Sequence, residues 1–367
     1  MSKVHYHDYL GLEKILNAQD PLSFKTDTPA HDEMLFITTH QSYEIWFKQV
    51  LFELDQVLSI FGQDSVDESS MGEIVHRLQR MVLIFKNLVT QVDLIETMTP
   101  LDFLEFRHLL HPASGFQSLQ FRLLENKLGL KRDDRLSYND LPYTAPLKKG
   151  QPEIAEKAEN EPSLFDCMQA WLERTPFLNV DKFSFWTGYM NGVDSIFEAE
   201  MKEIERNEHL SDEDRKKMVD QIKSSWEGFK GIFNEQLFND QKEQGNWKFS
   251  YSAVRAALLI ELYRDQPVFQ LPFRLLTAAK DLDAQLYQWR YRHSLMAQRM
   301  LGRKVGTGGS SGAHYLRSAA EKHRLFQDLY MLTSYFVPRS KLPALPEDAT
   351  KALGFYFNAE KDPHSLT

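Results

Sequence analysis

The chain has 367 residues, of which 42% are hydrophobic, and its net charge is −9 at neutral pH. That charge argues against a nucleic-acid or anionic-membrane partner, because both carry the same sign. The single cysteine, Cys167, excludes an intramolecular disulfide and a zinc site built from several thiolates. The N-terminus has no apolar signal region and no apolar run of about 18 residues occurs, so we expect a soluble, cytoplasmic protein.

Apolar residues recur at helical spacing along most of the chain, and alternating, strand-like segments are hard to find. We therefore predict an all-α fold with one domain over 1–367, an N-terminal arm at 1–20 and a charged helical insertion at 195–248. The polar, proline-containing stretch 131–162 is predicted to be a long surface loop. Helices are expected near 8–18, 31–62, 70–94, 100–110, 115–129, 162–174, 181–206, 212–238, 250–263, 269–301 and 313–335.

Three polar side chains interrupt the apolar faces of these helices, where burial without a partner costs roughly 1–3 kcal/mol. They are His40 in "FITTHQSYEIWFKQVLFEL", Arg107 in "PLDFLEFRHLLHPASGFQS" and His293 in "QWRYRHSLMAQRM". A lone inward histidine is more often a core residue bonded to a carbonyl, and an inward arginine can belong to a structural ion pair. Together the three favour a cavity with polar chemistry. The loop "GTGGSSG" after His293 adds backbone donors and the Thr307 hydroxyl.

Other catalytic motifs fit the sequence poorly. "GTGGSSG" lacks the Gly-Lys-Ser/Thr ending of a P-loop, and no predicted strand precedes it, as a dinucleotide-binding fold requires. The pairs Glu73/His76 and Glu105/His108 have the Glu-x-x-His spacing of a di-iron site in a helix bundle. Both pairs lie on polar helix faces, so solvated helix surface explains them better. A single inward histidine suits haem, because the porphyrin supplies four further ligands.

Long segments of the chain, from about residue 6 to residue 338, closely resemble the tryptophan 2,3-dioxygenase family. They are "HDEMLFITTHQSYEIWFKQ", "ETMTPLDFLEFRHLLHPASGFQSLQFRLLENKLG", "AWLERTP", "YRDQPVFQLPFRLLT" and "WRYRHSLMAQRMLGRKVGTGGSSGAHYLRS". The resemblance implies a homotetramer, a dimer of dimers, with one haem b per subunit. It also implies cleavage of the indole C2–C3 bond of L-tryptophan by O2. The product would be N-formylkynurenine, which begins tryptophan degradation by the kynurenine pathway.

The resemblance assigns roles to the three inward residues and two neighbours. His293 is the expected axial ligand of the haem iron, and Trp289, one turn earlier, is expected to restrain its imidazole. His40 is expected to hydrogen-bond the indole N–H and to act in catalysis by orienting the substrate. Arg107 matches the arginine that clamps the substrate carboxylate. Thr307 matches the residue that holds the backbone end of the amino acid.

The remaining positions implied by the resemblance line the pocket. Phe36, Phe103 and Phe121 are expected to form the indole pocket and the haem surround. Ser114 and Gly115 are expected to line the haem edge. Phe103 and Phe121 stand where some bacterial members have tyrosine, which removes hydroxyl groups and keeps the pocket's shape.

In the family an N-terminal arm covers the active site of a neighbouring subunit, and Tyr6, Tyr9 and Leu10 occupy the matching positions. This chain reads Tyr6-His7-Asp8-Tyr9 where the family usually has Tyr-Gly-x-Tyr. Two alternatives remain open. One is a related haem enzyme that oxygenates a substituted tryptophan or another indole without cleaving the ring. The other is a helical haem-binding or interaction protein without enzymatic activity.

Overall fold

The computed structural model of the chain consists of helices joined by turns and loops. No β-strand forms among the described residues, which confirms the predicted all-α fold class. None of the helices in this part of the chain has the length and apolar character needed to cross a membrane. The structure describes residues 4–63, 66–136, 141–174, 185–302 and 312–345.

The helices group into two compact units, which we describe one at a time. The first unit contains Met1–Ser65, His76–Phe165 and Asp281–Leu325. The second contains Val66–Val75, Asp166–Lys280 and Phe326–Thr367, and the charged segment 195–248 lies wholly within it. Every predicted site residue that the structure describes belongs to the first unit.

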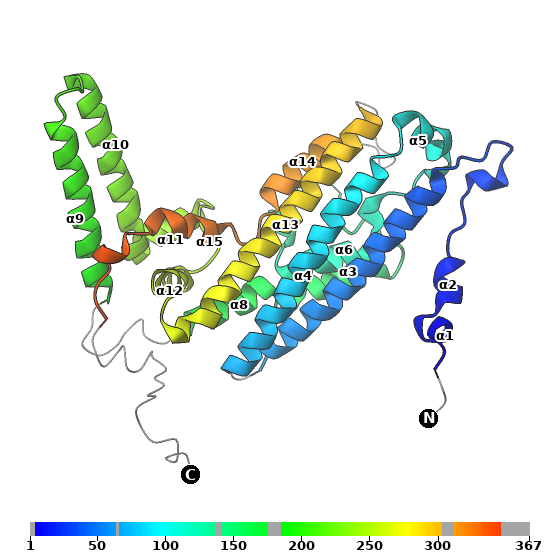
Figure 1. The fold of residues 1–367 in the computed structure, drawn as a ribbon, viewed down its shortest axis with the longest axis horizontal. Helices are drawn as coiled ribbons and strands as arrows, with labels where there is room; N and C mark the ends of the chain where they lie inside the picture. Colours follow the sequence, from blue (N-terminus) through cyan, green and yellow to red (C-terminus); the bar gives the residue numbers. More distant parts are fainter. Residues whose placement is uncertain (1–3, 64–65, 137–140, 175–184, 303–311, 346–367) are drawn as a thin grey trace, which may run out of the picture. The chain divides into compact units, whose positions relative to one another are not determined.

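Three long helices, α3, α4 and α13, lie side by side in the first unit (Figure 1). The helices of this unit are α1 (Tyr6–Leu10), α2 (Leu12–Leu16), α3 (Glu33–Phe61), α4 (Glu68–Ile95), α5 (Pro100–Arg107), α6 (Leu119–Leu128), α7 (Gln151–Asn160), α13 (Gln270–Leu301) and α14 (Gly312–Lys322), of which α4 and α13 begin in the second unit. Buried residues of α3 recur every three to four positions, as in Phe47, Val50, Leu54 and Val57. This spacing gives α3 one apolar face, and its burial stabilises the unit.

The second unit contains an antiparallel helix pair, α9 and α10, drawn in green in Figure 1. Its helices are α8 (Leu164–Glu173), which begins in the first unit, α9 (Phe185–Arg206), α10 (Asp212–Lys230), α11 (Glu235–Glu243), α12 (Tyr251–Leu262) and α15 (Gln327–Met331). The pair is joined by a hydrogen bond from Trp226 Nε1 to Asp194 Oδ1 (3.0 Å) and by the contact of Phe197 with Phe229. Short 3₁₀ turns occur at Ser23–Lys25, His108–Leu110, Gly115–Gln117, Arg132–Asp134, Gly231–Phe233, Pro267–Phe269, Leu332–Tyr335 and Arg339–Lys341.

The segment 131–162 differs from its prediction as a surface loop, because it contains helix α7. Gly150 precedes α7 in a left-handed conformation (φ 86°), and Pro152 lies in its first turn. Proline suits that position because the first amide groups of a helix have no intrahelical partner. Ala155 and Ala158 are buried, and α7 packs against α6.

Three other predicted helices are interrupted. The helix expected at 212–238 breaks after α10 at the 3₁₀ turn Gly231–Phe233, and α11 begins at Glu235. The helix expected at 8–18 is divided at Gly11, whose φ of 62° is left-handed. The helix expected at 313–335 stops at the end of α14. There the carboxylate of Asp283 accepts hydrogen bonds from Arg324 Nε and from the backbone N–H of Leu325, both at 2.8 Å. These bonds hold the chain in a non-helical turn.

Candidate functional site

An aromatic cluster that includes His40 and His293 joins α3, α5, α6 and α13. Phe36 on α3 contacts His40 one turn later, with ring centroids 4.1 Å apart, and it contacts Phe103 on α5 at 5.8 Å. Trp289 on α13 contacts Phe121 on α6 at 5.0 Å. Helices that are distant in sequence therefore bring the predicted pocket residues together.

Tyr43 and Phe47 connect the two sides of this cluster. The ring of Tyr43 lies edge-on to His40 at 6.1 Å and to Trp289 at 6.0 Å. Phe47, one turn further along α3, contacts Trp289 at 5.6 Å and Phe121 at 5.4 Å. Neither residue was predicted to belong to the site. Their position on the same apolar stripe as His40 is the sequence signal that could have found them.

The imidazole of His40 is held in one tautomer by its own helix. Its Nδ1 lies 2.7 Å from the carbonyl oxygen of Phe36, and a carbonyl can only accept, so Nδ1 carries the proton. Burial lowers the pKa of His40, although the Phe36 carbonyl and the charge of Glu44 act in the opposite direction. The ring is therefore neutral, and its Nε2 is an unprotonated acceptor.

His293 on α13 is also neutral, but its ring is held differently. Burial lowers the pKa of His293 to about 4. Its ring stacks on Trp289 one turn earlier, with centroids 5.5 Å apart and planes 17° apart. The two histidines are linked through Tyr43 and Trp289, because the ring of Tyr43 contacts both His40 and Trp289, and Trp289 stacks on His293. Both side chains keep part of their surface accessible.

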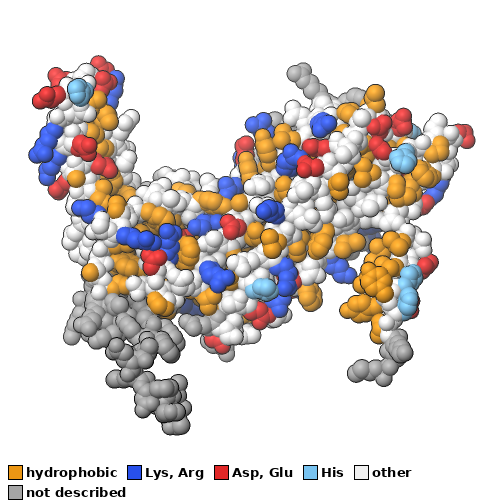
Figure 2. Space-filling model, viewed as in Figure 1, with side chains coloured by type: hydrophobic (Ala, Val, Ile, Leu, Met, Phe, Trp, Pro, Cys, Tyr) orange, Lys and Arg blue, Asp and Glu red, His pale blue; other side chains and the backbone are white. Residues whose placement is uncertain are grey.

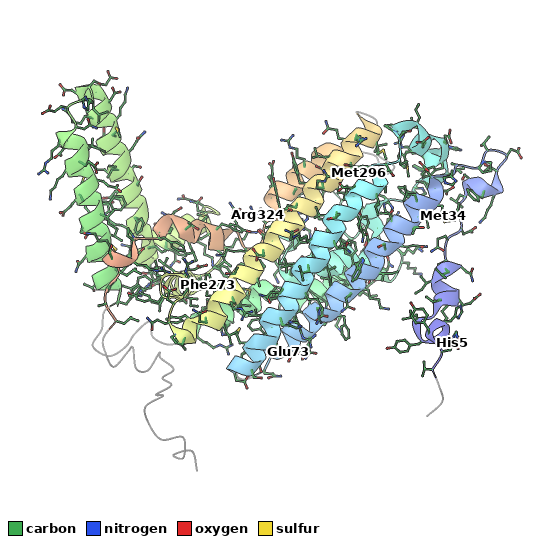
Figure 3. The ribbon with its side chains drawn as sticks, in the orientation of Figure 1. His5, Met34, Glu73, Phe273, Met296 and Arg324 are labelled. Atoms are coloured by element: carbon green, nitrogen blue, oxygen red, sulfur yellow. The ribbon has the colours of Figure 1, made fainter. Side chains whose placement is uncertain are left out.

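Arg107 ends α5 beside an apolar group of side chains at one end of the unit. Thr99 and Asp102 form a capping box that starts α5, and Pro100 occupies its first turn. Arg107 itself is half-buried and follows the fully buried Phe106. Figure 3 shows Met34 near the start of α3 and Met296 near the end of α13 at this same end. The apolar group consists of Ala30, Leu35, Phe36, Met98, Phe103, Phe106, Leu109, Leu110, Met296, Met300 and Leu301.

Ser114 and Gly115 lie in the turn that leads into α6. The Ser114 hydroxyl accepts from the backbone N–H of Phe116, and the Ser118 hydroxyl caps α6 by accepting from the N–H of Phe121 (3.1 Å). This turn sets the direction in which α6 presents Phe121 to the cluster. Contact of Ser114 and Gly115 with a haem edge stays a prediction. Thr307 lies outside the described residues.

The arm residues are exposed in a single chain. The exposed fractions are 71% for Tyr6, 78% for Tyr9 and 40% for Leu10. Figure 2 shows hydrophobic side chains gathered over α1 and α2. Large apolar side chains on one segment are typical of a surface that binds a partner. Within one chain these three residues do not join the aromatic cluster.

The two Glu-x-x-His pairs are solvated, as expected. Glu73, His76, Glu105 and His108 are all exposed. Among the described residues, no three His, Cys, Asp or Glu side chains come together as potential ligands of a metal ion.

The aromatic cluster fits a haem in three respects. The neutral imidazole of His293 makes no hydrogen bond within the described part of the chain, and a neutral ring nitrogen is what an iron ligand requires. The surrounding rings are apolar and flat. The hydroxyl of Tyr43 and the Nε1–H of Trp289 are buried donors without a partner among the described residues. Such donors are rare in native structures and are consistent with a polar ligand group beside them.

These features describe an all-helical protein with two neutral histidines in an aromatic cluster. The sequence profile of the tryptophan 2,3-dioxygenase family matches residues 1–336. The chain is 50% identical to the tryptophan 2,3-dioxygenase of Bdellovibrio bacteriovorus over 96% of this chain and 99% of that protein. It is 44% identical to that of Alteromonas mediterranea (96% and 97% covered) and 42% identical to that of Dictyostelium discoideum (96% and 88%). The chain belongs to the tryptophan 2,3-dioxygenase family.

Proposed function

We propose that this protein is a haem-dependent dioxygenase that cleaves the indole C2–C3 bond of L-tryptophan and forms N-formylkynurenine, the first step of the kynurenine pathway. The observation that carries the proposal is the pair His40 and His293, both neutral and both part of one cluster of aromatic rings. One histidine suits a haem ligand, and the other presents an acceptor toward a substrate. Membership of the family supports the same reaction.

The haem would be held by His293, with Trp289 stacked against the imidazole and Phe121 packed behind Trp289. The stack limits rotation of the ring and so keeps one nitrogen directed at the metal. When bound, the haem supplies the redox chemistry that activates O2. Ser114 and Gly115 would lie along its edge.

The substrate would be oriented by side chains of α3 and α5 together with Thr307. Phe36 and Phe103 provide flat apolar surface for the indole ring. His40 Nε2 accepts the indole N–H, because Nδ1 already donates to the Phe36 carbonyl. Arg107 would bind the substrate carboxylate through paired, charge-assisted hydrogen bonds, and Thr307 would hold the backbone end of the amino acid.

The chain contributes position and electrostatics to this reaction, and we assign no essential base. His40 keeps its Nδ1 proton in a 2.7 Å bond to its own helix, and burial opposes protonation of Nε2. Its part in catalysis is therefore to fix the plane and the polarity of the indole. Holding both reactants in place can lower the barrier without proton transfer by a side chain.

We also propose that the protein is a cytoplasmic homotetramer, in which the N-terminal arm of one subunit covers the aromatic cluster of another. Support comes from the aromatic residues Tyr6 and Tyr9, which are 71% and 78% exposed in a single chain. Burying one large apolar side chain stabilises a complex by roughly 1.5–3 kcal/mol, so binding of the arm to a second copy of the chain would be favourable.

The proposal is tested by the absorption spectrum of the purified ferrous protein with and without L-tryptophan under air, followed by the mass of the product. A haem spectrum that responds to tryptophan and a product that carries both atoms of O2 are expected. A product with one added oxygen would favour an enzyme that leaves the ring intact. A haem-bound protein without turnover would favour a binding protein.

A further inference from the structure

A buried ion cluster lies behind the aromatic rings and has no part in the site described above. The carboxylate of Glu125 on α6 accepts from Arg122 Nη1 (2.7 Å), Arg135 Nη1 (2.7 Å) and Arg290 Nη2 (2.8 Å). The four side chains are between 2% and 9% exposed. Burial alone would raise the pKa of Glu125, but the three guanidinium groups hold it well below its usual value. Glu125 is therefore a permanent buried anion.

This cluster ties α6 to α13 one turn before His293. Arg290 follows Trp289 directly, and besides Glu125 it binds the backbone carbonyl of His323 at 3.1 Å. Its guanidinium lies 5.8 Å from the centre of the Phe121 ring. Phe121 contacts Trp289, and Trp289 stacks on His293. The cluster and the ring stack thus fix the same two helices at the same level.

We propose that Glu125 is a positioning residue for His293: through Arg290 it fixes α13 against α6, and so sets the orientation in which Trp289 and His293 meet a ligand. The inference rests on the proposed function, in which His293 holds the haem iron. Apolar contacts alone allow helices to slide by small amounts, whereas a carboxylate shared by three guanidinium groups is satisfied in one arrangement. Substitution of a residue that orients a metal ligand commonly lowers metal affinity about 10- to 100-fold.

A second buried carboxylate in the same unit provides a matched control. Glu53 on α3 is 1% exposed and binds Arg77 Nη1 and Arg80 Nη1 on α4, both at 2.7 Å. It joins two helices, as Glu125 does, and burial opposes its charge in the same way. Its hydrogen-bond partners are Gln49, Arg77 and Arg80, which are not members of the aromatic cluster. Loss of Glu53 tests the effect of a broken buried ion pair without a disturbance at Trp289.

The experiment compares full-length wild type, Glu125→Gln and Glu53→Gln by haem titration of the apoprotein and by the resonance Raman band of the iron–histidine bond. We expect Glu125→Gln to bind haem about tenfold or more weakly and to shift that band. Glu53→Gln should match wild type in both. Wild-type behaviour of Glu125→Gln, or equal changes in the two variants, would overturn the inference.

Arg290→Lys covers the case in which Glu125→Gln does not fold. Lysine keeps the positive charge but cannot bridge the Glu125 carboxylate and the His323 carbonyl with a planar fork. The same weakening and band shift are expected, and a wild-type result overturns the inference. The proposed function is tested separately by His293→Ala. If His293 does not hold the haem iron, the wild-type spectrum has no iron–histidine band that is lost in this variant.

Discussion

His40 on α3 and His293 on α13 are both neutral because of burial, yet their rings are fixed by different means. His40 is oriented by the carbonyl of Phe36, four residues earlier in its own helix. His293 is oriented by stacking on Trp289, which is itself held by Phe121 and Phe47 from other helices. The orientation of the His40 ring on α3 is thus set by local structure, whereas the orientation of the His293 ring on α13 depends on tertiary packing. The two sides should respond differently to substitution.

The largest effect is expected on the α13 side. His293→Ala should abolish stable haem binding, because His293 is the one histidine of α13. His40→Ala is the matched control, since it removes the facing imidazole and should retain haem. Absorption spectra of the two variants after reconstitution check this difference. Normal haem occupancy with an unchanged axial-ligand spectrum in His293→Ala would contradict the assignment.

On the α3 and α5 side, Arg107→Ala should reduce kcat/KM for L-tryptophan by about 100-fold or more. Charge-assisted hydrogen bonds contribute roughly 1.5–3 kcal/mol each, and the substrate carboxylate would lose two. Arg107→Lys should recover only part of the activity, because lysine cannot form the paired bonds. Steady-state kinetics and thermal unfolding of each variant provide the measurement.

The same variants distinguish a substrate clamp from a structural arginine. Wild type should reject tryptamine, which lacks the carboxylate, and Arg107→Ala should discriminate much less. Its melting temperature should change little. An arginine paired with an internal carboxylate would behave in the opposite way, since its removal would cost roughly 3–5 kcal/mol of folding stability. Early unfolding with the wild-type preference would therefore count against the clamp.

A smaller effect is expected from the arm. Deleting residues 1–12 should raise the KM for tryptophan about tenfold, which corresponds to roughly 1.4 kcal/mol and to the burial of about one aromatic side chain. The melting temperature should fall little, because α1 is exposed within its own chain. Mixing the deletion variant with a full-length, catalytically dead chain should restore some activity. Unaltered kinetics of the deletion variant would show that the arm does not contribute to the active site.

The smallest effect is expected from the locally fixed histidine. His40→Ala should keep haem and lower kcat/KM between about two- and tenfold, because a hydrogen bond to a neutral N–H contributes roughly 0.5–1.5 kcal/mol. Turnover measured at saturating tryptophan separates binding from chemistry. Complete loss of turnover with intact substrate binding would show that His40 does more than orient the indole.

The sequence predicted the long helices well, because the stripes on α3 and α13 have a clear period. It also identified His40 and His293 as inward residues. It missed α7, because Pro152 suggested a loop, whereas proline in the first turn is compatible with a helix. Two alanines bury the face of α7 against α6, and a face of small residues gives little hydrophobic signal.

Contacts between distant residues were beyond the reach of the sequence pattern. The stop after α14 depends on Asp283, about forty residues before Arg324 along the chain. The Glu125 cluster was missed for the same reason. In sequence Glu125 and Arg290 are ordinary polar helix positions, and only the packing of α6 against α13 makes them buried partners.

Because the tautomer of His40 is fixed, the site should select substrates that present a hydrogen-bond donor to this ring. Nε2 offers only a lone pair, and moving the proton from Nδ1 to Nε2 would break the 2.7 Å hydrogen bond to the Phe36 carbonyl. A bicyclic analogue with oxygen or sulfur in place of the indole nitrogen would bring a second lone pair to the same point. N-methylation would put carbon there instead of a proton. Two molecules of nearly identical shape would thus be distinguished by a single hydrogen atom.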